Sequence, residues 1–197
     1  MADLAFLEQD AVDVAPLLLG ATLRANGVRV RLTEVEAYMG ERDPGSHAYR
    51  GPGRRNATMF GPAGRLYVYF TYGMHYCCNV VTGREGVASA VLLRAGEVVE
   101  GLELARERRP NAARDAELAS GPARLTRVLG ISLADDGTDL AAGPIRLEAA
   151  PDRAPAIASG PRTGVAGPGG GLEFPWRFWI PGEPSVSRYR PHVARRR

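Results

Sequence analysis

The pattern of apolar and polar residues in the first forty positions predicts a β-hairpin over residues 21–38. Two alternating stretches flank an Asn-Gly pair at 26–27, which favours the two-residue turn of a hairpin because both residues tolerate positive φ. Upstream, residues 11–20 have the composition of a short helix, with Asp10 as its N-cap, and Pro16 is expected either near the start of this helix or at a bend in it.

The phase of this alternation changes inside the second strand. Apolar residues occupy one face at Val28, Val30 and Leu32, and after a shift they continue at Val35 and Ala37. A β-bulge or a change of sheet produces such a shift. Beyond it, the other face carries Glu34, Glu36 and Tyr38.

Residues 66–81 predict two further strands that meet at Tyr72 and Gly73, and residues 87–95 predict a third. Short turns join these strands, so we expect them to form an antiparallel meander. The Tyr72–Gly73 turn lies at the tip of its hairpin, where a side chain can protrude from the sheet.

Helical spacing of apolar residues predicts a surface helix over residues 96–110, because its first half is acidic and its end is basic, as the helix dipole favours. A second short helix is expected over residues 121–130, with Ser120 near its start. Residues 144–149 and 176–180 resemble late strands.

Two stretches are rich in glycine and proline and predict long loops. Residues 40–65 hold six glycines and five arginines with almost no aliphatic residues, and residues 151–171 hold ten Gly or Pro. Long ordered loops are usually functional. At the C-terminal end, the Arg-rich residues 183–197 predict a solvated tail, with phosphate binding as the less favoured alternative.

The length and composition favour one compact α/β domain over residues 1–182, followed by that tail. A chain of 197 residues with 45% apolar residues can bury one continuous core but is short for two. No apolar run approaches the ~20 residues that span a bilayer, and the first residues are acidic where a signal peptide is basic. We therefore expect a cytoplasmic protein without membrane partners.

The type of basic residue is more informative than the net charge. The net charge of +3 is weak evidence for nucleic-acid binding, but all 25 basic residues are arginine. A compositional bias that also enriches Ala and Gly explains most of this effect. Because the chain has no lysine, no lysine side chain can form a Schiff base with a sugar aldehyde. The adjacent Cys77 and Cys78 are expected to be small buried residues rather than a disulfide.

Several chemistries lack their motifs. The histidines at 47, 75 and 192 and the two cysteines lack zinc-site spacing, and the sequence has no phosphate-binding GxxxxGKS/T loop and no GxSxG elbow. We expect no metal and no nucleotide cofactor. What remains is Glu36, which shares a strand face with Tyr38 near a tyrosine-rich meander.

A carboxylate beside aromatic planes suits a reaction in which water attacks a sugar carbon while a flat base is held by stacking. A simpler interpretation is that Glu36 is solvated and the tyrosines pack the core. Without further information that interpretation is favoured, but a specific motif resemblance reverses the preference.

The segment TEVEAYMGERDPGSHAYRGPGRRNATMFGPAGRLYVYFTYGMHYCCNVV resembles the alkyladenine (3-methyladenine) DNA glycosylase family, the type without a helix-hairpin-helix. The likeness continues in order through VLLRA and, more loosely, through SGPARL, RTGVAG and FWIPG. The resemblance implies an α/β fold around a curved antiparallel sheet with a protruding hairpin. It also implies that no metal is required and that an aromatic side chain enters the minor groove.

The resemblance implies that Glu36 is the general base that activates water and that Arg94 of VLLRA helps to hold this water. A backbone carbonyl near Thr163 is a further candidate contact of the water. The arginines of the loop that follows Glu36 are candidate phosphate contacts: Arg50, Arg54 and Arg55.

The same resemblance implies an aromatic pocket for an extruded base. Tyr38 and Tyr69 would sandwich the base, and His47 would line its edge. Asn79 would crowd the purine 2-position, and Tyr72 would fill the vacated stack. Without the resemblance, His47 and Asn79 would be interpreted as ordinary structural residues.

The expected function is therefore that of a monomeric DNA glycosylase that acts on double-stranded DNA, associated with the nucleoid in a bacterium. Its expected substrates are damaged purines: 3-methyladenine, hypoxanthine and related alkylated or etheno bases. It would leave an abasic site. The alternatives are a non-catalytic lesion-binding protein, against which an intact Glu36 argues, and a base-specific RNA-binding protein.

Overall fold

The computed structural model describes residues 4–71, 73–150 and 156–193. The predicted hairpin is formed by β1 (Thr22–Ala25) and β2 (Val28–Tyr38), and Asn26 and Gly27 at its turn have φ values of 48° and 83°. A two-residue turn with both φ values positive matches the twist of its flanking strands, so the local sequence determines this register.

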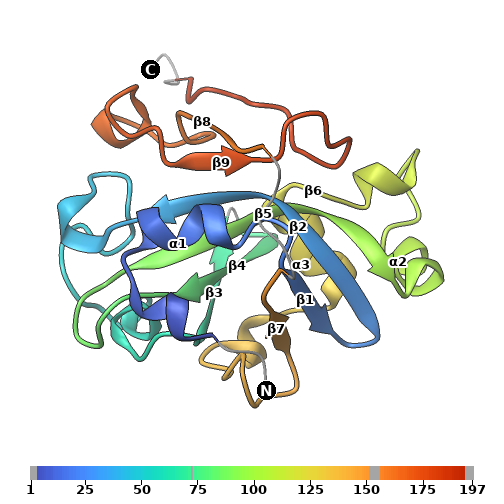
Figure 1. Ribbon diagram of the computed structural model, residues 1–197, viewed down its shortest axis with the longest axis horizontal. Helices are drawn as coiled ribbons and strands as arrows, with labels where there is room; N and C mark the ends of the chain where they lie inside the picture. Colours follow the sequence, from blue (N-terminus) through green and yellow to red (C-terminus); the bar gives the residue numbers. More distant parts are fainter. Residues whose placement is uncertain (1–3, 72, 151–155, 194–197) are drawn as a thin grey trace.

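An antiparallel sheet of nine strands forms the centre of the molecule (Figure 1). Its main path runs in the order β3-β4-β5-β2-β1-β7, while β6 pairs with β5 and β9 pairs with both β2 and β8. The remaining strands are β3 (Leu66–Thr71), β4 (His75–Val81), β5 (Ala90–Glu100), β6 (Ala119–Ser120), β7 (Arg146–Glu148), β8 (Ala158–Gly160) and β9 (Arg177–Trp179). The expected single α/β domain with an antiparallel sheet is confirmed.

The bulge predicted in β2 is present. Leu32 pairs with Gly96, Glu34 pairs with Ala95 and Val35 pairs with Leu93, so the register between β2 and β5 shifts before Glu34 and shifts back after it. The shift turns the apolar residues that follow it, such as Val35, into the core. Glu34 and Glu36 then lie on the opposite face of the sheet.

Three helices pack on this sheet in the part of the chain that the structure describes. They are α1 (Ala11–Leu17), α2 (Leu102–Arg108) and α3 (Pro122–Leu129). α1 packs against β2 and β5, whereas α3 packs against β4, β5 and β6 (Figure 1). Single-turn 3-10 segments connect the elements at Ala5–Glu8, Gly40–Arg42, Ala57–Phe60, Asp115–Glu117, Leu133–Asp135 and Pro168–Gly170.

Two details of the predicted helices are wrong. The helix expected over residues 96–110 begins only at Leu102, because residues 96–100 extend β5 along β2 before Gly101, at φ 75°, turns the chain. Asp10 occupies the N-cap position of α1 but makes no capping bond with its side chain. The hydroxyl of Ser89 instead accepts the backbone N–H of Ala11 at 3.0 Å, a contact between distant segments.

The segments expected as loops are partly interior. Asp43 and Asn56 of the 40–65 stretch are buried, and Arg162 of the 151–171 stretch is only 1% exposed. The solvated tail predicted for residues 183–197 does not begin at residue 183. Ser185 is buried and Ser187 donates its backbone N–H to a buried carboxylate, so this segment packs on the domain.

The apolar face of the sheet contributes to the main core, with Val35, Ala37, Val80, Val91 and Leu93 on its central strands. Cys77 and Cys78 are both buried and free, as expected. Among the described residues, no helix is long and apolar enough to cross a bilayer.

Candidate active site

The polar face of the sheet carries a row of residues that crosses four strands. Glu36 of β2 lies opposite Leu92 of β5, Leu92 lies opposite Asn79 of β4, and Asn79 lies opposite Tyr67 of β3. Residues directly opposite one another across a sheet point to the same side. The strand register therefore brings together side chains that are far apart in the sequence.

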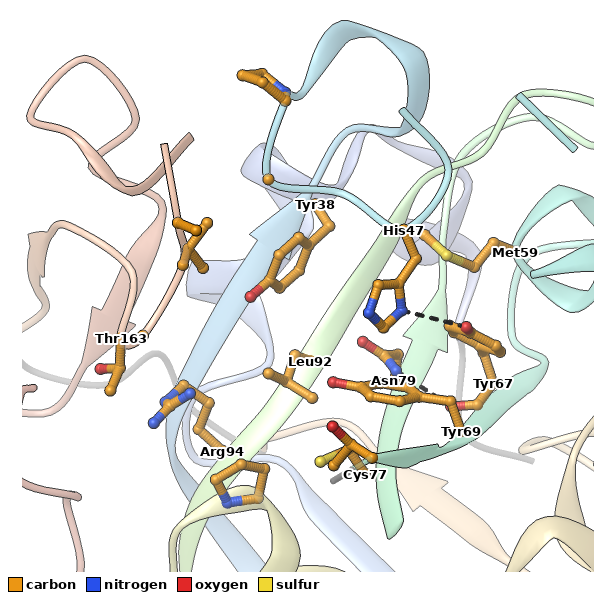
Figure 2. Close-up of a pocket in the computed structure, with 17 residues that line it drawn as sticks. Tyr38, His47, Met59, Tyr67, Tyr69, Cys77, Asn79, Leu92, Arg94 and Thr163 are labelled. Carbon is orange, nitrogen blue, oxygen red and sulfur yellow. Dashed lines mark hydrogen bonds between the residues drawn. The ribbon is translucent and has the colours of Figure 1, made fainter. Parts of the chain in front are cut away.

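Above this row lies a cavity of about 380 Å³ (Figure 2). Loops from the N-terminal half and the C-terminal half of the chain complete its walls. The residues that line it include Tyr38, Pro44, Gly45, His47, Met59, Tyr67, Tyr69, Cys77, Asn79, Leu92, Arg94, Pro122 and Thr163 to Ala166. Five of the residues predicted from the sequence are thus together at one cavity: Tyr38, His47, Tyr69, Asn79 and Arg94.

Glu36 lies directly behind the cavity wall and is fully buried. Its Oε2 accepts the hydroxyl of Tyr38 at 2.9 Å and lies 3.3 Å from Nη1 of Arg94, while Oε1 accepts the backbone N–H of Thr163 at 2.7 Å. Each of these three partners lines the cavity. The carboxylate is therefore held in one orientation at the boundary of the cavity.

Arg94 is the one arginine among the described residues that line the cavity. Burial acts to lower the pKa of its guanidinium, but the charges of Glu36 and Glu34 outweigh burial and raise the pKa. Its Nε donates to Glu34 at 2.8 Å and its Nη2 to the hydroxyl of Ser187 at 3.4 Å. The side chain is thus a permanent cation with a fixed orientation.

Glu34 is a buried carboxylate whose importance the sequence did not reveal. It also accepts Nε of Arg177 at 2.7 Å and the backbone N–H of Ser187 at 2.6 Å. Burial acts to raise the pKa of Glu34, but Arg94 and Arg177 lower it below its ordinary value. The only sequence signal was its place on the same strand face as Glu36.

The side walls of the cavity are aromatic. Tyr38 and Tyr69 approach the space from different sides, with His47 next to Tyr69 (Figure 2). The rings of His47 and Tyr69 meet edge to face at a centroid distance of 4.6 Å, and Tyr67 stacks on Tyr69 at 5.6 Å. A flat, electron-poor group between such rings gains stacking and cation–π energy.

The surroundings of these aromatic walls shift the pKa values of their titratable groups toward the neutral form. Burial, with the charge of Glu36, raises the pKa of Tyr38 well above its ordinary value, and burial raises the pKa of Tyr67 to about 12. Burial lowers the pKa of His47, and the charge of Arg55 lowers it further. Each of these shifts favours the uncharged side chain beside a cationic guest.

Asn79 is 4% exposed and lies at the floor of the cavity. Its side-chain amide donates to the carbonyl of Tyr67 at 3.2 Å, which fixes the amide plane. A rigid amide at this place limits the depth to which a substituent of a bound ring can enter.

Arg162 is a further residue whose role the sequence did not indicate. Its guanidinium makes two bonds of 2.6 Å to Asp43 and one of 2.9 Å to the carbonyl of Ala37, and it lies 4.5 Å from the ring centroid of Tyr38. It thereby joins the loop before His47, the end of β2 and the wall that begins at Thr163. Its place as the first residue of the loosely matched RTGVAG motif was the one available signal.

The predicted phosphate contacts lie outside the cavity. Arg50, Arg54 and Arg55 are exposed, and Arg55 donates to the carbonyl of Phe70 at 3.0 Å and approaches the Tyr69 ring at 5.8 Å. Tyr72 lies outside the described residues, between β3 and β4 in the sequence. Within the described ranges, no group of three or more His, Cys, Asp or Glu residues could hold a metal ion.

The geometry fits a flat ring inside the cavity, with a buried carboxylate and a guanidinium at one wall. Comparison with known proteins agrees with the resemblance noted in the sequence. A family model described as methylpurine-DNA glycosylase matches residues 5–184.

Several relatives cover nearly the whole chain. A protein of Leifsonia xyli subsp. xyli is 60% identical over 193 residues, which span 93% of this chain and 90% of the relative. A protein of Streptomyces avermitilis is 56% identical over 200 residues, which span 98% and 93%. Each is named "Putative 3-methyladenine DNA glycosylase". The family match and these identities show that the chain belongs to the methylpurine-DNA glycosylase family.

Proposed function

We propose that this protein is a DNA glycosylase that extrudes an alkylated purine from duplex DNA and hydrolyses its N-glycosidic bond. One observation carries the proposal: a buried carboxylate, Glu36, and a cation, Arg94, lie 3.3 Å apart at the wall of an aromatic cavity. Membership of the methylpurine-DNA glycosylase family and the names of the relatives support it.

In the proposed reaction, Glu36 takes a proton from a water molecule as the water oxygen attacks C1′ of the deoxyribose. The C1′–N9 bond breaks, and its electron pair leaves with the purine. An N3- or N7-alkylated purine carries a positive charge before cleavage and departs as a neutral base, so it needs no general acid. The products are the free base and an abasic site in an otherwise intact strand.

Arg94 would hold the attacking water beside Glu36, and Tyr38 and Tyr69 would stack on the two faces of the base, with His47 at its edge. Stacking returns roughly 1–3 kcal/mol per base, against a few kcal/mol for extrusion. A charged lesion gains additional cation–π energy from tyrosine faces. The balance favours bases that are damaged or weakly paired, such as 3-methyladenine. Hypoxanthine and etheno bases are uncharged, so their departure would additionally need a proton donor to the purine.

Glu36→Gln tests this proposal, because glutamine keeps the shape of glutamate and removes the base. We expect lesion binding within about threefold of wild type and a single-turnover base release that is slower by about 10²–10⁴. Glu41→Gln, which changes an exposed glutamate of the loop that follows β2, serves as the matched control. Base release by Glu36→Gln at the rate of this control would reject Glu36 as the base, while no release by wild type would reject the function.

A further inference from the structure

Glu34 is the second carboxylate on this face of β2, and it precedes the proposed base, Glu36, by two residues. Glu34 is fully buried and does not line the cavity, and its two oxygens are bound by Arg94, Arg177 and the backbone N–H of Ser187. Its bond to Nε of Arg94 at 2.8 Å leaves Nη1 of the same guanidinium facing Glu36 at 3.3 Å. One planar cation thus bridges two carboxylates with different surroundings.

The cluster is balanced in charge. Glu34 and Glu36 carry two negative charges, and Arg94 and Arg177 carry two positive charges. Arg177 is held in place by the Trp179 ring, 4.5 Å from its guanidinium carbon. Since a guanidinium is rigid and planar, a short bond at Nε determines the direction in which Nη1 points.

The C-terminal segment completes the arrangement. Ser187 donates its backbone N–H to Glu34 at 2.6 Å and accepts Arg177 at its carbonyl at 3.0 Å. Three residues later, the carbonyl of Arg190 accepts the N–H of Gly164, which belongs to the cavity wall, at 2.9 Å. The segment therefore connects the carboxylate cluster to the wall that contacts Glu36.

We propose that Glu34 is a positioning residue. Glu34 holds Arg94 so that the guanidinium reaches the water, and it also draws Arg94 partly away from Glu36. This inference rests on the proposed function. Without the negative charge of Glu34, Arg94 would pair more closely with Glu36, and the carboxylate would be a weaker base for water. Binding of a lesion would not depend on Glu34.

Glu34→Gln tests the role, with Glu183→Gln as a matched control. Glu183 lies on the same C-terminal segment and pairs with Arg31 at 2.8 Å, away from the cluster. We expect Glu34→Gln to slow single-turnover base release by about 10- to 100-fold with lesion affinity within about threefold of wild type, and Glu183→Gln to behave as wild type.

Two readouts separate positioning from a general loss of structure. Glu34→Gln should shift the acid limb of the pH–rate profile to lower pH, because an unshared Arg94 favours ionised Glu36. The groups that face the two carboxylates are Arg94, Arg162, Arg177, Tyr38, Tyr69 and Cys77. In an Arg94→Gln background, Glu34→Gln should cause less than about a twofold further loss of rate.

If Glu34→Gln does not fold, Glu34→Asp decides, since it keeps the charge and shortens the reach by one methylene. We expect Glu34→Asp to fold and to lose rate without losing lesion affinity. A wild-type rate of base release by Glu34→Asp would overturn the inference, and so would an equal effect of Glu34→Gln with and without Arg94. In either case an active wild-type protein would leave the proposed function unaffected. An inactive wild type would overturn both.

Discussion

At the scale of single residues, burial decides what each polar side chain of the site can do. Glu36 and Arg94 are both withdrawn from bulk water, so each is oriented by a few short contacts rather than by solvent. Interactions between charges are stronger in such surroundings than at a surface. The same burial shifts the pKa values of Tyr38 and Tyr67 further above the neutral range.

Asn79 offers a test of selectivity at this scale. Replacement of Asn79 by Ser should remove the amide that is fixed against the Tyr67 carbonyl and open space at the cavity floor. We expect the ratio of guanine to hypoxanthine release to rise, by about tenfold, because a 2-amino group then enters more deeply. Single-turnover release from matched duplexes measures this ratio, and an unchanged ratio would remove Asn79 from the proposed role.

At the scale of elements, the sheet and two loops supply different residues of the site. β2 and β5 supply Glu36 and Arg94, β3 and β4 supply Tyr69 and Asn79, and the stretch after Arg162 closes the wall. The β3–β4 hairpin lines the cavity as far as Thr71, and its turn lies between Thr71 and His75. The base pocket and the turn thus belong to the same two strands.

This arrangement motivates a prediction for Tyr72, which is proposed to fill the vacated stack. Tyr72→Ala should remove stacking worth roughly 1–3 kcal/mol and lower the extruded fraction by roughly five- to a hundred-and-fifty-fold. The loss should be larger for a lesion in a stable pair than for the same lesion opposite a mismatch or in a single strand. Single-turnover release at fixed salt compares the three contexts, and equal penalties would contradict a role in the duplex.

At the scale of the whole molecule, buried ion pairs join segments from the entire chain. Glu34 connects β2, β5, β9 and the C-terminal segment, and Arg162 connects Asp43 to the late cavity wall. Breaking a buried pair by removing one partner is strongly destabilising, because the remaining charge stays buried. Stability and the shape of the site are therefore linked.

The lowered pKa of Glu34 predicts how stability depends on pH. A carboxylate with a lowered folded-state pKa stabilises the fold above its ordinary value of 4.5, and this contribution is lost as the pH falls through the lowered value. The free energy of unfolding of wild type should therefore fall more steeply than that of Glu34→Gln below about pH 5. Urea unfolding from pH 7 to pH 3 checks this, and parallel curves would refute it.

The absence of lysine from the sequence predicts the fate of the product. Without a lysine amine, the enzyme should leave the abasic strand uncut and should form no adduct that borohydride traps. Protein with an acetylated N-terminus is the control, because the terminal amine is the remaining candidate. An adduct that persists after acetylation would contradict hydrolysis by water alone.

Local patterns in the sequence were sufficient for part of this molecule. The Asn26-Gly27 turn, the alternation of β2 with its bulge, the β3–β4 hairpin and the helix at 121–130 depend on residues close in sequence, and all were predictable. The EAY, SHAYRG, LYVYFTYGMHYCCN and VLLRA motifs identified five residues that share the cavity, and Glu36 behind it. Local backbone preferences and motif spacing act over a few residues, so they can be recognised in the amino-acid sequence alone.

Only the tertiary structure decided which distant groups meet. Glu34 is bound by residues 94, 177 and 187, and Asp43 by residue 162, through contacts that no short-range pattern records. The first residues of the helix expected over residues 96–110 belong to β5, because their pairing with β2 is more favourable than the helix that their apolar spacing predicts. Likewise, a buried carboxylate needed N–H donors, so a segment that resembles a solvated tail packs on the domain. Burial and strand pairing are properties of the assembled chain, and they decide between local alternatives that the sequence leaves close in energy.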